Sequence, residues 1–307
     1  MRATQRSKPS RKPLLDRLLR AAHRAPLAVP VSWNFWRRYR SPGGPRLEVV
    51  GAGNLWRHRD TVILFVHGAF GGAWMWQEHF LPYFRKSGRS VYALSLRGHG
   101  RSKGRDQIQS WRFSDYIDDV RCVIERIGAP VILVGHSLGG LIVQRLIGRV
   151  PMRALVLLAS APPEGILLVG NSLVLPHPTA LLENILRTRS DGKASMAELW
   201  RRALFSHELP AKQVVAYAAR LGPESRRALA DARMPGPVLP AQSIGIPSLV
   251  LSANGDRIIE RSMARRTALF HGATLRIVRP SGHAIMLDAS WRKAAEIIRE
   301  WLEDHGL

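Results

Sequence analysis

Ser137 occupies the centre of a Gly-His-Ser-Leu-Gly turn at residues 135–139, between the apolar run 131–134 and a segment compatible with a helix. Small residues at both ends of the turn permit a sharp reversal from strand to helix, which exposes the serine hydroxyl at the top of the turn. The N-terminus of the following helix favours negative charge that develops beside the serine. The pattern predicts a nucleophilic serine, and its alternative is an ordinary strand–turn–helix with a surface serine.

A serine hydroxyl needs a base within hydrogen-bond reach and a carboxylate that orients this base. Among the eleven histidines, His283 lies in a small-residue loop between the last predicted strand and the last predicted helix. Asp256 follows the predicted strand at 248–253, so both residues belong to the sheet edge that carries Ser137. Turn chemistry alone would also explain an Asn-Gly-Asp sequence, and Glu164 is the rival acid. The order Ser…Asp…His is the one expected for a nucleophile elbow in an α/β sheet.

Acyl transfer at a serine also needs hydrogen-bond donors for the oxyanion of its tetrahedral intermediate. Leu138 offers one backbone N–H at the start of the helix, and the glycine-rich loop after His67 offers a second. We expect the second donor to be Ala69, with Phe70 as the alternative. A glycine-rich loop also suits phosphate, but the chain has neither a Gly-Lys-Ser/Thr nor a Gly-x-Gly-x-x-Gly sequence beside it. With a single cysteine at Cys122 there is no cysteine-rich metal site either, so we expect no cofactor and no metal.

The elements that must position these residues are strands that alternate with helices. Apolar, β-branched runs predict strands at 61–66, 91–96, 131–134, 154–159, 248–253 and 274–278. Helical patterns lie between them, at 76–86, at 113–127 with Ser114 as its cap, at 261–269 and at 290–301. The expected fold is therefore α/β, with a mostly parallel central sheet and helices on both faces. Strand patterns disappear between 160 and 243, where helix-like pieces at 179–187, 195–205 and 211–220 predict a helical insertion.

The first 45 residues differ from the remainder of the chain. The chain has 307 residues and a net charge of +23, of which the first 46 residues contribute +11 through twelve cations and one acid. Residues 14–25 form a basic amphipathic pattern, followed by interleaved tryptophans, tyrosine and arginines. We expect this leader to associate peripherally with an anionic membrane surface, or else to pack on the domain's own surface. No RNA-binding or helix-turn-helix signature accompanies the charge, so no specific nucleic-acid partner is expected.

Five motifs occur in a fixed order. They are His-Gly-Ala-Phe-Gly-Gly-Ala-Trp at 67–74, Arg-Gly-His-Gly-Arg-Ser at 97–102, Gly-His-Ser-Leu-Gly-Gly at 135–140, Asn-Gly-Asp at 254–256 and Gly-His at 282–283. Together they resemble the α/β-hydrolase superfamily over residues 47–305. The resemblance implies that Ser137 is the nucleophile, His283 the base and Asp256 its partner, with Ala69 and Leu138 as oxyanion donors. It also implies a core at 46–159 and 244–307, and a cap over the active site at 160–243.

The expected activity is hydrolysis of a carboxylic ester, a lactone or a thioester through an acyl-enzyme. The first motif is similar to that of small-ester carboxylesterases, and the second recurs in monoacylglycerol-type lipases. Dehalogenases and epoxide hydrolases of the superfamily use an aspartate nucleophile, which Ser137 disfavours. Carbon–carbon hydrolases, haloperoxidase-like enzymes and a non-catalytic binding module remain alternatives. Apolar cap residues suggest a small-molecule ester with an apolar acyl or aromatic moiety. No secretory signal or spanning segment is evident, so a cytoplasmic location is expected.

Overall fold

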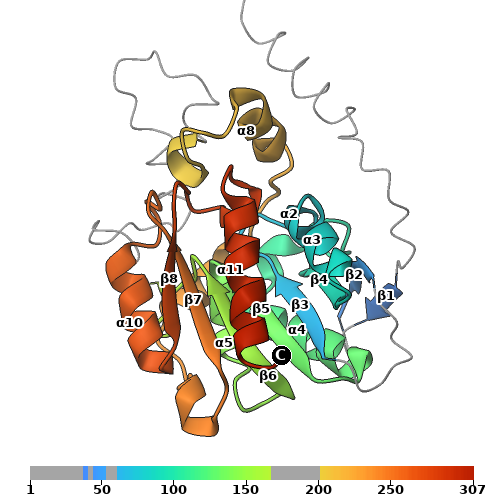
Figure 1. Ribbon diagram of the computed structural model, residues 1–307. Coiled ribbons are helices and arrows are strands. Elements are labelled where there is room, and N and C mark those ends of the chain that lie inside the picture. Colours follow the sequence, from blue (N-terminus) through green and yellow to red (C-terminus); the bar gives the residue numbers. More distant parts are fainter. Residues whose placement is uncertain (1–36, 41–43, 53–60, 167–200) are drawn as a thin grey trace, which may run out of the picture.

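The central strands of the sheet form from apolar runs of the chain, which are buried on both faces. The computed structural model describes residues 37–40, 44–52, 61–166 and 201–307, and these contain one eight-stranded sheet (Figure 1). The strands are β1 (Arg37–Arg40), β2 (Arg46–Ala52), β3 (Val62–Val66), β4 (Ser90–Ser95), β5 (Val131–His136), β6 (Met152–Leu158), β7 (Ser248–Ala253) and β8 (Thr274–Val278). Their order is β1-β2-β4-β3-β5-β6-β7-β8, and all pairs from β4 to β8 are parallel. The two pairs formed by β2 are antiparallel.

Helices cover both faces of this sheet, as expected for parallel strands joined by crossover connections. The helices of the core are α2 (Trp74–Gln77), α3 (Phe80–Lys86), α4 (Phe113–Ile127), α5 (Leu138–Gln144), α10 (Arg261–His271) and α11 (Trp291–Asp304). The first apolar cluster joins α2, α3 and α11 to one face, and the second joins α4, α5 and α10 to the other. Successive residues of a strand point to opposite faces, so Ile63 belongs to the first cluster and Leu64 to the second. The predicted α/β fold with helices on both faces is confirmed.

The segment after β6 contains short helices and no strand in its described part. Two helices are complete there, α8 (Ala211–Ala218) and α9 (Arg226–Arg233), and residues 201–204 are also helical. In Figure 1, α8 lies beyond the end of the sheet at which β5 and β7 finish. The sequence predicts the first of these helices but not α9, which is too polar and arginine-rich for its apolar face to be recognised. The predicted helix at 179–187 falls outside the described residues.

Three expectations differ from the structure. The sheet begins inside the segment assigned to the leader, because Arg37–Arg40 pairs with β2 as the edge strand. The helix predicted at 76–86 is two helices, interrupted at His79, whose backbone leaves the helical region. Ser114 is not the cap of α4. The helix starts at Phe113, and Asp115 accepts a hydrogen bond from the Arg112 N–H at 2.7 Å.

Within the described ranges, no helix combines the length and the apolar character needed to cross a membrane.

Candidate active site

Ser137 lies at the junction of β5 and α5 in a backbone conformation that few non-glycine residues adopt. Its φ is 52° and its ψ is −120°. The turn is fixed on both sides, because the Ser137 N–H donates to Leu158 O at 3.1 Å and its carbonyl accepts from Ala161 N–H at 3.0 Å. A methyl group at Gly139 would lie 2.3 Å from His67 O, which requires glycine there. A strained conformation held by surrounding contacts is typical of functional sites.

His283 and Asp256 meet at the carboxyl edge of the sheet, as their positions after β8 and β7 predict. The Nδ1 of His283 lies 2.9 Å from Asp256 Oδ2 and 3.1 Å from Oδ1. Oδ1 also accepts the N–H groups of Ile258 and Ile259, at 2.8 and 2.9 Å. Both side chains are almost fully buried. Because a carboxylate is an acceptor, the His283 Nδ1 carries the proton, and in the neutral ring Nε2 is left with its lone pair.

A hydrogen bond also links His283 to the turn at 135–139 that carries Ser137. The Nε2–H of His136, the residue before Ser137, donates to His283 O at 3.0 Å, and the two rings are 4.8 Å apart. Burial keeps the pKa of His136 well below its usual value, so it is a neutral donor. In the described part of the chain, the Ser137 hydroxyl forms no hydrogen bond with the His283 ring. Catalytic hydrogen bonds of free enzymes are often long and tighten when substrate binds.

The loop after β3 packs directly on the elbow. A methyl group at Gly68 would lie 2.8 Å from Ser137 Cβ, so only glycine allows this approach. His67 fixes the loop, because its Nδ1–H donates to Gly68 O at 2.7 Å and its Nε2 accepts the Leu96 N–H at 3.0 Å. Burial lowers the pKa of His67 to about 3, so the ring stays neutral in this arrangement. Since the peptide is planar and trans, the held Gly68 carbonyl also fixes the direction of the Ala69 N–H.

The two candidate oxyanion donors in this loop, the N–H groups of Ala69 and Phe70, differ in whether they already form a hydrogen bond within the protein. The Phe70 N–H donates to Glu224 Oε2 at 3.1 Å, and Phe70 O accepts the Gly222 N–H at 2.8 Å. Among the described residues, the N–H groups of Ala69 and Leu138 donate to no protein acceptor. Of these two N–H groups, that of Phe70 is therefore occupied, whereas that of Ala69 has no acceptor among the described residues.

Two further acids, Glu164 and Asp288, have other partners. Glu164 accepts from Arg266 at 3.3 Å on the surface, and the carboxylate that contacts the His283 ring is that of Asp256. Asp288 is fully buried and accepts the Gly282 N–H at 2.7 Å, together with the Ser206 N–H and hydroxyl. It thus braces the loop that carries His283. In the sequence, the signal of this role is no more than a carboxylate six residues after Gly282, which does not distinguish Asp288 from a surface acid.

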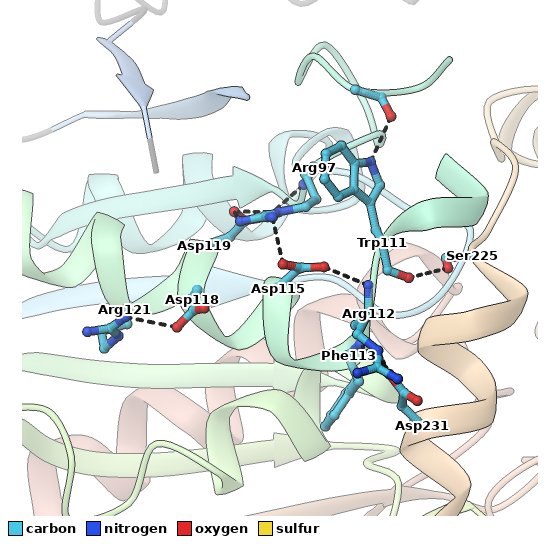
Figure 2. Close-up of polar contacts among 11 residues, drawn as sticks. Arg97, Trp111, Arg112, Phe113, Asp115, Asp118, Asp119, Arg121, Ser225 and Asp231 are labelled. Atoms are coloured by element: carbon cyan, nitrogen blue, oxygen red, sulfur yellow. Dashed lines mark hydrogen bonds and ion pairs between the residues drawn. The ribbon is translucent and has the colours of Figure 1, made fainter. Parts of the chain in front are cut away.

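Figure 2 shows how the loop at 97–102 is anchored on α4. The guanidinium of Arg97 reaches Asp119 at 2.7 Å and Asp115 at 3.0 Å, and it lies 5.1 Å from the centre of the Trp111 ring. The chain around α9 attaches nearby, where the Ser225 hydroxyl donates to Trp111 O at 2.6 Å. The loop at 97–102 and the segment before α9 are therefore both fixed to the same end of α4.

The described residues contain no cluster of three or more histidine, cysteine or acidic side chains that could hold a metal ion.

A comparison with known sequences decides the family. The profile of the alpha/beta hydrolase family matches residues 63–297. The chain belongs to this family. This alpha/beta hydrolase is 38% identical over 116 residues to a bifunctional esterase/perhydrolase of Acinetobacter calcoaceticus, covering 35% of the chain and 40% of that protein. It is 32% identical over 147 residues to epoxide hydrolase 4 of Mus musculus, covering 47% of the chain and 35% of that protein. The matches thus span less than half the length of these relatives.

Solved structures show the same fold across nearly the whole chain. An esterase of Exiguobacterium antarcticum superposes with a TM-score of 0.66 at 17% identity, covering 88% of the chain and 100% of the esterase. An enol-lactonase of Burkholderia xenovorans LB400 gives 0.62 at 19% identity, covering 86% and 99%. A thioesterase domain of the curacin biosynthetic pathway gives 0.61 at 20% identity, covering 87% and 100%. At identities of 17–20%, these comparisons show that this alpha/beta hydrolase shares the fold of the three proteins.

Proposed function

We propose that this protein is a serine hydrolase that cleaves a carboxylic ester, with a lactone or a thioester as the related possibilities, through an acyl-enzyme. The observation that carries the proposal is the buried His283–Asp256 pair, attached through His136 to the strained turn of Ser137. A neutral imidazole whose Nδ1–H is held by a carboxylate presents its Nε2 as a general base. The relative named as an esterase/perhydrolase supports the same reaction class.

In the proposed reaction, His283 Nε2 accepts the proton of the Ser137 hydroxyl while Oγ attacks the ester carbonyl. The N–H groups of Ala69 and Leu138 stabilise the oxyanion, and each such donor is typically worth about 2.7–4 kcal/mol. Collapse of the intermediate expels the alcohol, which takes the proton from His283. Water then attacks the acyl-enzyme, again giving its proton to His283. Collapse of this second intermediate breaks the bond to Ser137 Oγ, which takes the proton back from His283 as the acid leaves.

The test is turnover of p-nitrophenyl acetate and butyrate, combined with labelling by a fluorophosphonate probe. We expect turnover, labelling of Ser137, and loss of both in Ser137→Ala. Folded protein that neither hydrolyses the esters nor reacts with the probe would rule the proposal out. Carbon–carbon hydrolases and haloperoxidase-like enzymes use the same triad, so a substrate panel must separate them from an esterase. Esters of graded acyl length test the expectation of an apolar acyl or aromatic moiety.

We further propose that the basic leader attracts the protein to anionic membrane surfaces. Residues 1–36 carry eight cations and one acid beside the apolar stripe at 14–22. A polybasic segment gains on the order of 1 kcal/mol per cation near an anionic bilayer. Because Arg37–Arg40 forms the edge strand of the sheet, the leader relevant to this proposal ends before it.

A further inference from the structure

Glu224 is a buried carboxylate that the proposed reaction does not use. It lies between α8 and α9, and its side chain is 1% exposed. Its Oε2 accepts from the Phe70 N–H and contacts His99 Nε2, each at 3.1 Å. Its Oε1 accepts from the Tyr116 hydroxyl and the Ser225 N–H, each at 2.7 Å. Burial of a carboxylate costs free energy of desolvation, which is offset only when the group is paired with a cation and its oxygens accept hydrogen bonds, as here.

His99 supplies the compensating charge. Its Nδ1 lies 3.0 Å from Arg97 O, which accepts but cannot donate, so Nδ1 carries a proton. Its Nε2 faces Glu224. Burial lowers the pKa of His99, but the charge of Glu224 and the hydrogen bond between them outweigh this and raise it overall. Burial likewise raises the pKa of Glu224, and the charge of His99 outweighs it and lowers the pKa overall. The pair is therefore an imidazolium and a carboxylate.

The Glu224 carboxylate is linked to the candidate active site by its hydrogen bond with the backbone N–H of Phe70. Phe70 has a φ of 64°, which is unfavourable for a residue with a side chain. Its N–H is held by Glu224 and its carbonyl by the Gly222 N–H, at 3.1 and 2.8 Å. The peptide on the other side of Ala69 is held by His67 through Gly68 O. The two peptide planes that flank Ala69 are thus fixed by different buried side chains.

We propose that Glu224, paired with His99, is a positioning residue that holds the Ala69–Phe70 peptide so that the Ala69 N–H is aimed at the oxyanion. This inference rests on the proposed function, because it assigns Ala69 the role of a donor. It places one of the determinants of the oxyanion site in the segment between α8 and α9, 154 residues away from Phe70 in the sequence.

The arrangement of donors makes a carboxylate necessary. Each oxygen of Glu224 accepts one backbone N–H, that of Phe70 on Oε2 and that of Ser225 on Oε1. A glutamine side chain has a single oxygen, so in either orientation its amide nitrogen faces one of these N–H groups as a second donor. In one orientation Glu224→Gln loses the Phe70 contact directly. In the other its amide nitrogen is repelled by the Ser225 N–H, which moves the side chain away from Phe70. The size of the side chain is nearly unchanged in both cases.

The test compares Glu224→Gln with Tyr116→Phe. The second variant removes a hydrogen bond from the same carboxylate but on Oε1, away from Phe70. Both are expected to lower the melting temperature. With p-nitrophenyl butyrate, Glu224→Gln is expected to reduce kcat roughly 10- to 100-fold at a nearly constant KM, short of the ~10²–10³ for complete loss of a donor. Tyr116→Phe is expected to keep kcat within about threefold, because the Phe70 contact persists.

Amide hydrogen exchange of the segment 68–71 measures how firmly this loop is held, and the measurement needs no substrate. Exchange should accelerate in Glu224→Gln and not in Tyr116→Phe. Equal losses of kcat in both variants, a rise in KM alone, or unchanged exchange at 68–71 would each overturn the inference while leaving the esterase proposal standing. If exchange responds as expected but the wild-type protein turns over no ester, the proposed function fails instead, and with it the role of Ala69.

Discussion

Replacing Asp256 by asparagine tests whether His283 acts as the base, because it should change which ring nitrogen of His283 carries the proton. The carboxylate uses Oδ1 to accept two backbone N–H groups, from Ile258 and Ile259, and it holds His283 Nδ1 at 2.9 Å from Oδ2. An asparagine must keep its one oxygen toward the two backbone donors. Its amide NH₂ then faces His283 Nδ1, which becomes an acceptor. The ring proton moves to Nε2, so the ring cannot take the proton of Ser137.

This change of tautomer should cost about 10⁴ in kcat, the magnitude for a triad whose histidine is held in the wrong tautomer. That factor corresponds to about 5.4 kcal/mol of transition-state stabilisation. The fold should persist, because the backbone donors remain satisfied, so the melting temperature of Asp256→Asn should stay within a few degrees.

The assay is kcat for p-nitrophenyl butyrate, with the rate of fluorophosphonate labelling as a second measure. Glu164→Gln is the matched control, because Glu164 also follows a strand but is paired with Arg266 at the surface. It should retain kcat within about twofold, as expected for loss of an exposed ion pair. If Asp256→Asn keeps kcat within tenfold of the wild type, Asp256 does not orient the base and the reasoning is wrong.

Three further outcomes are expected. Gly68→Ala should lower kcat/KM by roughly 10- to 100-fold, because its methyl group would lie 2.8 Å from Ser137 Cβ and must push the loop away from the elbow; unchanged kcat/KM would contradict the loop's role. Acid should destabilise the fold through His271, whose Nδ1 accepts the Ala241 N–H and whose pKa burial lowers from 6.5 to about 4. The unfolded chain binds this proton first, so stability present above pH 6.5 falls by on the order of 3 kcal/mol toward pH 4. Urea midpoints across this range should fall less in His271→Gln, and an identical fall would exclude the assignment. Deletion of residues 1–36 should abolish sedimentation with anionic liposomes at low salt and leave ester turnover intact; full-length protein that ignores such liposomes would refute the membrane proposal.

The sequence alone predicts the six parallel strands, but not β1 and β2, and it predicts that the candidate site residues follow strands. Both predictions depend on local patterns. A buried strand appears as an unbroken apolar run, as at Val62–Val66 and Ser248–Ala253. Parallel strands bring residues that follow them to one edge, so the sequence predicts that His283 and Asp256 lie together, and their side chains are 2.9 Å apart. Gly135 is equally local, because a methyl group there would lie 2.6 Å from Gly139 O in the same turn, whereas Gly139 is required by a tertiary contact with His67 O.

Other features depend on contacts that a local pattern does not contain. β1 is rich in arginine, and only its pairing with β2 makes it a strand. The break at His79 interrupts an otherwise helical stretch. There the His79 ring stacks on Trp291 at 4.3 Å between centroids, which is a partner 212 positions later in the chain. These are tertiary effects that override the local preference of the chain.

The insertion at 160–243 shows most clearly why the contacts around the candidate site cannot be predicted from the sequence. Its described parts touch both loops that flank Ser137. At one end, Ser206 shares the carboxylate of Asp288 with Gly282, and Leu204 O accepts the Ala284 N–H at 2.9 Å, next to His283. At the other end, Glu224 and Gly222 hold Phe70. All of these contacts include a backbone amide on at least one side, so the identity of the residue on that side leaves no trace in the sequence. Two of these contacts are purely backbone, and the others have a buried carboxylate on the second side, that of Glu224 or Asp288. These two acids differ from surface acids only through the burial that the fold provides. Substitutions in the described part of the insertion should therefore alter the candidate site through these two carboxylates before they alter the contacts of any substrate.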